Sequence, residues 1–316
     1  INDRAEMTPM YWWTNIAVRE TPKARVFGST DEVIFVDQGF AGYGSGKLPY
    51  LPTVPDVDLS FPQNFPFANE YFFQNPKSMN SPWESILYED GQVFYERSTT
   101  ALRYKKMFCW GNHVGGRGWQ EFLSDASSAD FSPYLELQAG LAPTQLHGYQ
   151  MAGNSTISFT QFFGSFTKIE NQQLLAAKWS DVQQQISNQI ENVVPTDLLD
   201  SENLRFEKLA TKEPAELLFQ GSGWGLLEQL RRQRSGEEIP SGFQFKSSDN
   251  AQIGEWIELL ESGNFPDFEV SNTPTSWMVQ KEWISLLENS RQNWLSSLHI
   301  GNYYFEIGQR EAAIEQ

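Results

Sequence analysis

The chain has 316 residues, and 40 acidic against 23 basic side chains give it a net charge of −17. This charge repels nucleic-acid phosphates and anionic lipid surfaces, which excludes both as expected partners. No apolar run approaches the length of a membrane helix, and the single cysteine, Cys109, has no second cysteine for an internal disulfide. We therefore expect a cytoplasmic protein that binds neither nucleic acid nor membranes.

Short β-branched and aromatic runs, bounded by Gly, Pro, Asn and Ser, predict an antiparallel β-sandwich over residues 1–167. The proline-rich span 39–82 is expected to be an ordered loop with one edge strand at most. The predicted strands are VIFV (33–36), QVFYERSTTALRY (92–104), KMFCW (106–110), YLELQAG (134–140) and STISFTQFFGSF (155–166).

Helical spacing of apolar residues begins near Lys168, so residues 168–290 are expected to form an α-helical linker domain and the fold class is α+β. Its predicted helices lie in KIENQQLLAAKWSDVQQQISNQIENV (168–193), PAELLFQ (214–220), GLLEQLRRQR (225–234) and IGEWIELLESG (253–263), followed by a long pattern from Ser276 to Gly308.

The last 23 residues carry Gly301, Tyr304, Gly308 and Ala313 at the spacing of a tetratricopeptide (TPR) helix pair. Residues 291–316 are therefore expected to start a TPR-like repeat. One repeat cannot bury its own apolar face, so we expect the natural protein to continue as a helical array that holds a protein partner.

The segment KKMFCWGNHVGGRGWQ, residues 105–120, gathers aromatic rings, polar side chains and four glycines. Sugars favour this mixture, since aromatic rings stack on their apolar faces and polar groups bind their hydroxyls. We expect it to form one wall of a sugar-binding cleft; a tight β-hairpin with edge tryptophans is the alternative. The candidate residues are Trp110, Asn112, His113, Arg117 and Trp119.

A second candidate site lies in YLELQAGLAPTQLHG, residues 134–148. On a strand Glu136 and Gln138 share one face, so Glu136 is a candidate acid or base beside a hydroxyl-binding amide. Gln145 is a further binding candidate and His147 a candidate acid. An ordinary solvated strand face and a surface histidine are the alternatives.

In MYWWTNIAV, residues 10–18, strand alternation places Trp12 and Trp13 on opposite faces. One indole is expected in the core and the other beside a ligand, and Asn15 shares the face of Trp13. The three histidines are dispersed and no metal or cofactor motif occurs, so no metal site and no cofactor are expected.

Four segments, MYWWTNIAV, FCWGNHVGGRGWQEFLS, PYLELQAGLAPTQLHG and ELLFQGSGWGLLE, together with the repeat-like end, resemble a family of large bacterial proteins. In that family a domain of unknown function precedes TPR repeats. The domain is similar to the aldose 1-epimerase (galactose mutarotase) supersandwich, a two-layer β architecture whose concave face binds sugars. The resemblance implies a mutarotase-like sandwich, whole or partial, in which MYWWTNIAV is an internal strand. The stretch SPWESILYEDGQVFYERS departs from related proteins, which often carry histidine there.

Two classes of function follow. The first is a carbohydrate-active enzyme, a glycoside hydrolase or sugar epimerase, in which Glu136 works with His113 or His147. As a hydrolase it would take its second carboxylate from Glu96, Glu121 or Asp125. The second class is a non-catalytic carbohydrate-sensing or scaffold protein whose TPR-like helices bind another protein. A carbohydrate ligand is expected in both.

Overall fold

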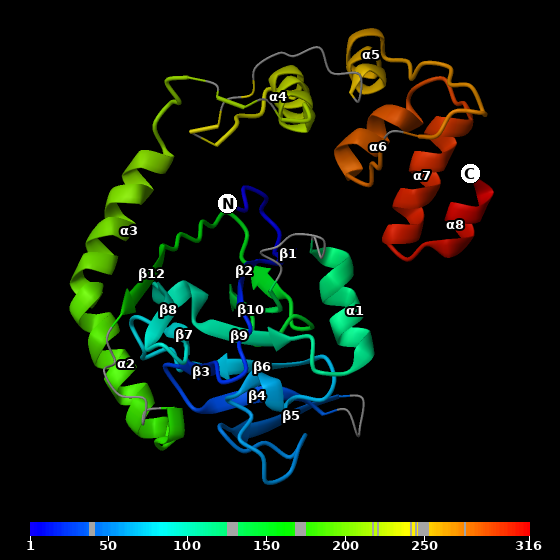
Figure 1. The fold of residues 1–316 in the computed structure, drawn as a ribbon. Helices are drawn as coiled ribbons and strands as arrows, with labels where there is room; N and C mark the ends of the chain where they lie inside the picture. Colours follow the sequence, from blue (N-terminus) through cyan, green and yellow to red (C-terminus); the bar gives the residue numbers. More distant parts are fainter. Residues whose placement is uncertain are drawn as a thin grey trace. The chain divides into compact units, whose positions relative to one another are not determined.

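The computed structural model describes residues 1–37, 42–124, 132–167, 175–216, 218–219, 221–240, 242–243, 245, 253–274 and 276–316. The chain divides into two compact units, Ile1–Leu209 and Ala210–Gln316. The first unit holds the antiparallel sheets and the second is helical (Figure 1). The predicted α+β class, with the strands in the N-terminal part, is therefore confirmed.

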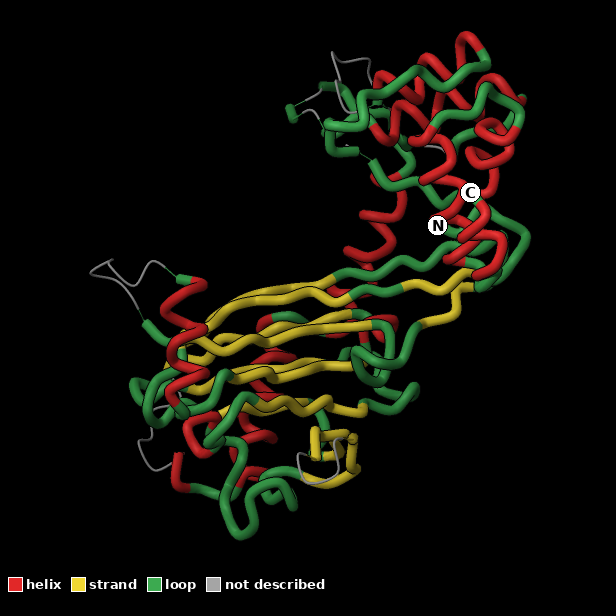
Figure 2. The backbone as a smooth tube through the Cα atoms, turned by 90° about the vertical axis from the view of Figure 1, so that its right-hand side faces the viewer, coloured by secondary structure: helices red, strands yellow, loops and turns green. Residues whose placement is uncertain are grey.

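A six-stranded antiparallel sheet, the larger sheet, runs through the first unit and is seen in Figure 2 as strands lying side by side. Three of its strands coincide with predicted runs, those at 33–36, 106–110 and 134–140. In spatial order its strands are β2 (Trp13–Arg19), β10 (Tyr134–Gly140), β9 (Tyr104–Cys109), β6 (Asn69–Gln74), β4 (Glu32–Asp37) and β5 (Gly42–Lys47).

A four-stranded antiparallel sheet, the smaller sheet, lies between the larger sheet and helix α2 (Trp179–Val193). The indole N–H of Trp179 donates to the Val26 carbonyl at 3.0 Å, and its ring stacks on Phe27 at 5.6 Å. Helices α2 and α3 (Thr196–Ala210) thus fall within the first unit, whereas the sequence pattern placed a boundary at 167. The strands of the smaller sheet are β12 (Gln161–Thr167), β8 (Gln92–Ser98), β7 (Trp83–Leu87) and β3 (Arg25–Gly28).

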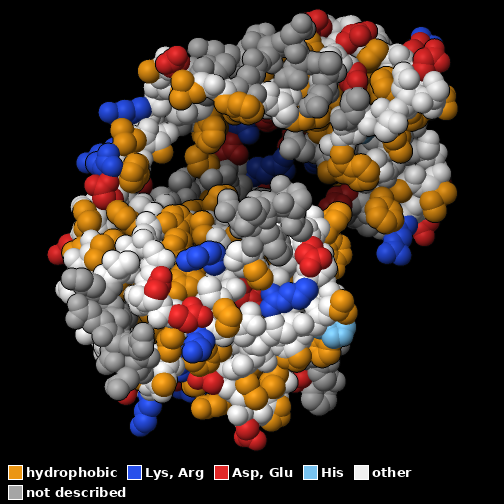
Figure 3. Space-filling view, viewed as in Figure 1, with side chains coloured by type: hydrophobic (Ala, Val, Ile, Leu, Met, Phe, Trp, Pro, Cys, Tyr) orange, Lys and Arg blue, Asp and Glu red, His pale blue; other side chains and the backbone are white. Residues whose placement is uncertain are grey.

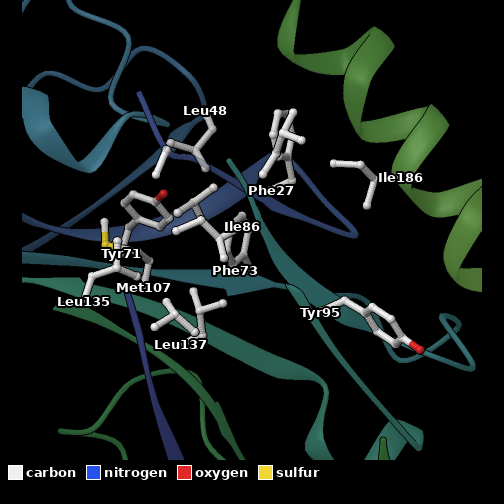
Figure 4. Close-up of a cluster of buried hydrophobic side chains, with 14 of the residues drawn as sticks. Phe27, Leu48, Tyr71, Phe73, Ile86, Tyr95, Met107, Leu135, Leu137 and Ile186 are labelled. Carbon is white, nitrogen blue, oxygen red and sulfur yellow. The ribbon is translucent and has the colours of Figure 1, made fainter. Parts of the chain in front are cut away.

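The core of the first unit lies on both faces of the smaller sheet. Ile86 lies with Phe73 and Met107 of the larger sheet, while Tyr95 points toward the side on which Ile186 of α2 lies (Figure 4). Shorter elements complete the unit. They are the β1–β11 pair (Thr8–Met10 and Tyr149–Met151) and the 3-10 turns η1 (Pro62–Asn64) and η2 (Thr100–Leu102).

Three expectations for the first unit were wrong. The span 39–82 contains β5 and also β6, which is a central strand between β9 and β4. Its aromatic residues Tyr71 and Phe73 are fully buried, which outweighs the surrounding prolines. Helix α1 (Val114–Leu123) replaces the expected loop or hairpin after β9. Strand β2 lies at an edge of the larger sheet, not inside it.

The buried core of the second unit gathers around Trp256, Trp283 and Leu287. Gly263 ends α5 with φ 75°, as predicted for a C-cap. The described residues of 214–220 are not helical; Leu218 and Phe219 are exposed, so no apolar contact stabilises a helix there. The helices are α4 (Trp224–Ser235), α5 (Gly254–Ser262), α6 (Lys281–Glu288), α7 (Trp294–Glu306) and α8 (Arg310–Glu315).

Helices α7 and α8 form a tight helical hairpin. Gly308 provides the turn with φ 80°, a conformation that favours glycine. A Cβ atom on Gly301 would lie 3.2 Å from the carbonyl oxygen of Ala313, a tight contact, so glycine favours the close approach of the two helices there. The spacing that predicted a TPR-like helix pair thus corresponds to close helix packing. Within the described helices, none has the length and apolar character needed to span a bilayer.

Candidate functional site

The face of the larger sheet that points away from the smaller sheet, the outer face, carries most of the polar residues predicted to bind. Strand register defines it, because residues opposed in an antiparallel pair project to the same side. Gln138 of β10 pairs with Asn15 of β2 and with Lys106 of β9, which pairs in turn with Phe72 of β6. The adjoining row contains Ala17, Glu136, Phe108 and Glu70.

Lys106 lies at the centre of a hydrogen-bonded network on the outer face. Its ammonium group contacts Glu70 Oε2 at 2.7 Å and donates to Gln145 Oε1 at 2.8 Å. The Gln145 amide donates to Gln138 Oε1 at 2.9 Å, and the Gln138 amide donates to Glu136 Oε2 at 2.8 Å. Five side chains therefore form one continuous network from β6 to β10, bridged by the turn after β10.

Aromatic rings surround the lysine at the centre of this network. Lys106 Nζ lies 5.2 Å from the ring centroid of Phe72 and 5.4 Å from that of Phe108, within the range of cation–π attraction. Trp13 and Tyr43 meet Phe72 edge-on at 5.7 and 5.8 Å. The outer face thus combines a polar network with rings from four strands.

Two further tryptophan contacts shape this face. A Cβ atom on Gly140 would lie 2.4 Å from the Trp13 ring, so only glycine lets that indole lie flat against the sheet. Trp110, directly after β9, meets Phe108 at 5.0 Å and Tyr134 at 6.1 Å. Trp13, Trp110 and Tyr134 are all partly exposed, so their rings are open to a ligand.

Burial and charge perturb the ionisable groups of the outer face. Burial lowers the pKa of Lys106, and the nearby Glu70 carboxylate opposes that shift. Burial, with the charge of Glu70, raises the pKa of the phenols of Tyr43 and Tyr11. Both phenols therefore remain protonated at neutral pH and can donate hydrogen bonds; Tyr43 lies 3.4 Å from Glu70 Oε1.

His147 lies in the exposed turn that also carries Gln145. Its Nδ1 is 2.7 Å from the hydroxyl of Thr144, which fixes the position of the ring. The structure therefore brings Glu136, Gln138 and Gln145 into one network, with His147 two residues beyond Gln145 in the same turn.

The candidates on and beside α1 have structural contacts instead. His113 is the N-cap of α1, where Nδ1 accepts from the Gly115 amide at 3.4 Å. Arg117 binds Asn112 and forms an ion pair with the buried Glu20 at 3.2 Å. The segment 105–120 is thus divided between a strand that enters the site and a helix whose polar groups hold it to the sheet.

The remaining candidates lie apart from the network. Trp12 precedes β2 and packs against Phe159 with ring centroids 5.6 Å apart. Among the carboxylates considered for a hydrolase, Glu96 is buried between the sheets, Glu121 is exposed on α1, and Asp125 lies outside the described residues. Glu96 and Glu121 are therefore poor partners for Glu136.

Glu70, Phe72 and Tyr43 belong to the site but were not anticipated from the sequence. They lie on strands drawn from the proline-rich span, so their proximity to Glu136 depends on long-range strand pairing. Lys106 was also not predicted. Strand alternation does indicate its direction, because neighbouring residues of a strand, such as Lys105 and Lys106, point to opposite faces.

The part of the chain that the structure describes contains neither a cluster of metal ligands nor an activated thiol. There, no cluster of three His, Cys, Asp or Glu side chains is positioned to hold a metal ion. Cys109 is buried, and burial raises the pKa of its thiol, which opposes formation of a nucleophilic thiolate.

Comparison with known proteins gave no family model and no curated protein that matches the chain. A solved TPR-domain containing protein from Parabacteroides distasonis ATCC 8503 is 12% identical, with a TM-score of 0.46 over 99% of this chain and 49% of its own. The Slr1438 protein from Synechocystis sp. PCC 6803 is 9% identical, with a TM-score of 0.35 over 53% of this chain and 48% of its own. The chain thus spans about half the length of each, and neither likeness supports a conclusion on function.

Proposed function

We propose that the first unit binds a carbohydrate on the outer face of the larger sheet, as the resemblance to mutarotases implies. The observation that carries this proposal is the network from Glu70 through Lys106 and Gln145 to Glu136, surrounded by aromatic rings. A sugar ring has an apolar face for an indole or phenyl ring, and its hydroxyls both donate and accept hydrogen bonds.

The charge of the network favours a neutral ligand. Two carboxylates, Glu70 and Glu136, accompany the single cation Lys106, which is already paired. An anionic ligand such as a phosphate would find no free cation in this network, and the net charge of −17 opposes its approach. A neutral polyhydroxyl compound meets neither obstacle.

The two carboxylates also suit acid–base chemistry. Glu70 and Glu136 both lie opposite Phe108, one on each side of β9, so their Cα atoms are about 10 Å apart. Side chains from Cα atoms this far apart are able to bring two carboxyl groups to the separation of roughly 6.5–9.5 Å that leaves room for a water in inverting glycosidases. The proposed reaction is hydrolysis, in which Glu70 takes a proton from water and Glu136 protonates the leaving oxygen. Epimerisation by Glu136 and His147 is the alternative reaction.

The proposal is tested first by thermal shift of the full chain against a panel of neutral mono- and oligosaccharides. A ligand that binds only the folded state stabilises it by RT ln(1 + L/Kd) at ligand concentration L, so Tm rises with ligand concentration. We expect Tm to rise with saccharide concentration. Trp13→Ala should need a roughly tenfold higher concentration for the same rise, because it removes a stacking ring. His113→Ala is the matched control, since this side chain caps α1, and it should keep the affinity. A panel without any saturable shift would refute the proposal.

Catalysis is tested separately with the saccharide so identified. Glu136→Gln should keep its affinity and lose turnover, because the amide cannot transfer the proton. The anomeric form of the first product, read by NMR, separates inversion from retention. Undiminished turnover in Glu136→Gln would remove the catalytic assignment and leave the binding site intact.

A scaffold role for the second unit is the second candidate. A hollow of about 620 Å³ lies along α7 and α8, lined by Trp294, Leu298, Gly301, Phe305 and Ile314, among others. Phe305 and Ile314 are 65% and 85% exposed, as expected for a repeat surface that packs another helix. Fluorescence polarisation with labelled amphipathic helical peptides tests this role. Ile314→Asp places a charge in the lining of the hollow at an exposed position and should abolish binding, whereas an unchanged affinity would exclude the hollow as the binding surface.

A further inference from the structure

Helix α1 turns the polar side chains of Arg117 and Gln120 toward the sheet and its apolar side chains outward. Gln120 is its only fully buried residue, and its amide donates to Glu20 and to the Tyr134 carbonyl at 3.2 and 2.7 Å. Arg117 points to the same carboxylate. Surface helices of globular proteins normally show the reverse arrangement. Exposed apolar side chains on the other side of α1 are Val114 (77%), Trp119 (55%), Phe122 (78%) and Leu123 (53%).

Two glycines on this exposed side have no explanation within the described chain. Glycine is a poor residue for a helix interior. Gly116 is required, since a Cβ atom there would lie 2.0 Å from the Trp110 carbonyl oxygen. A Cβ atom on Gly118 would meet nothing within 4 Å, and one on Gly115 only the His113 ring at 3.9 Å. These two glycines leave a hollow of about 280 Å³ beside Trp119 and Phe122.

The chemistry of this face favours a protein partner over a sugar or a membrane. Arg117 and Gln120 face inward, so among the described residues the hollow is lined by Gly115, Gly118, Trp119 and Phe122, and the Trp119 indole N–H is its one side-chain partner for sugar hydroxyls. Helices that bind membrane surfaces carry Lys or Arg on their exposed flanks, whereas the only cation of α1 is engaged with Glu20. Close glycine-lined surfaces are suited to another helix.

We propose that this face pairs with the same face of a second copy of the chain. A two-fold axis that crosses α1 between positions 118 and 119 sets the two helices antiparallel. Gly118 of one copy then lies opposite Trp119 of the other, and Gly115 lies opposite Phe122. Each ring meets a glycine recess, which is the self-complementarity that a two-fold interface requires.

The exposed area indicates how strong this pairing is. Four apolar side chains that are 53–78% exposed offer on the order of 500 Å² per copy. Stable interfaces bury roughly 800 Å² per partner, so this face alone supports a weak, reversible dimer. Figure 3 shows acidic and basic side chains dispersed over the visible face of the first unit, but the net charge of −17 on each copy opposes association and adds to the weakness of the dimer.

Sedimentation equilibrium of the full chain across the micromolar range tests the proposal. The wild type should show a monomer–dimer equilibrium. Gly118→Leu should weaken the dimer roughly tenfold or more by filling the recess, although leucine is more apolar and a better helix former. Leu204→Ala on α3, which removes an equally exposed apolar side chain, is the control and should leave the equilibrium unchanged.

Two further results decide the geometry. A short bismaleimide should cross-link Gly118→Cys between copies but not Leu204→Cys, because the proposed axis passes beside position 118. A protein that is monomeric throughout, or a dimer that Gly118→Leu strengthens, would overturn the proposal. A monomer whose Tm falls in Gly118→Leu would show instead that this chain fills its own recess.

Discussion

Lys105 and Lys106 are neighbours in β9, but they point to opposite faces of the larger sheet and occupy different environments. Lys105 lies between the sheets, fully buried, 2.6 Å from Glu96 Oε2 and 2.6 Å from the Ser98 hydroxyl. Lys106 lies on the outer face; its side chain is only 3% exposed, but that of its partner Glu70 is 17% exposed. Both lysines are thus buried, and the two pairs differ in their carboxylates, since Glu96 is 3% exposed whereas Glu70 keeps contact with water.

The sealed cluster is a structural device. Glu96 also accepts from Gln161 at 2.9 Å, and Gln161 accepts from Thr14 at 2.7 Å, so the cluster joins strands of both sheets. Glu84, which pairs with Glu96 in the β7–β8 register, is fully buried beside it. The comparison teaches that a buried ion pair alone does not mark a functional site; access and aromatic rings distinguish the outer face.

The largest expected effect comes from Lys105→Met. The substitution leaves Glu96 buried without its cation, and breaking a buried pair in this way costs about 3–5 kcal/mol. Urea unfolding, followed by hydrogen exchange of the β9 amides, measures the loss. If the free energy of unfolding falls by less than about 1 kcal/mol, the Lys105–Glu96 pair contributes no more than an exposed ion pair, and the contrast between the two lysines is wrong.

Lys106→Met should destabilise the first unit less, by roughly 1–2 kcal/mol, because Glu70 remains in contact with water. The same exchange measurement compares it directly with Lys105→Met. Equal losses for the two variants would show that both faces are equally sealed.

Glu84→Gln should change the free energy of unfolding only slightly at low pH but should change clearly how that free energy depends on pH. Burial and the Glu96 charge raise the pKa of Glu84 well above 4.5 in the folded protein. The stability due to protonated Glu84 is therefore fully present below 4.5 and is lost as the pH rises toward the folded pKa. The Gln variant should lose less stability as the pH increases. Parallel pH profiles for the two proteins would contradict the shifted pKa.

The smallest expected effect is that of Gln145→Ala on saccharide binding. Gln145 bridges Lys106 and Gln138 without being charged, so its loss should cost about 0.5–1.5 kcal/mol, roughly a threefold to tenfold change in affinity. Isothermal titration measures it, with Leu146→Ala, an exposed neighbour, as control. An affinity that Leu146→Ala alters more than Gln145→Ala would place the ligand elsewhere.

The sequence predicted the features that depend on neighbouring residues and missed those that depend on long-range strand pairing or on tertiary contacts. Period-two alternation predicted β9 and β10 and the shared face of Glu136 and Gln138, because strand geometry depends on neighbouring residues. Helix α1 was not predicted, since three glycines among its ten residues lower its helix propensity. Glu70 was missed because the pairing of β6 with β9 brings together segments about 35 residues apart, which no local pattern encodes.

The most direct test of the central claim is the saccharide affinity of Lys106→Met, measured by isothermal titration on the folded variant with the sugar that shifts the wild type. Lys106 connects both ends of the outer-face network, so we expect affinity to fall at least roughly tenfold while the unit stays folded. Wild-type affinity in Lys106→Met would contradict a carbohydrate site on the outer face.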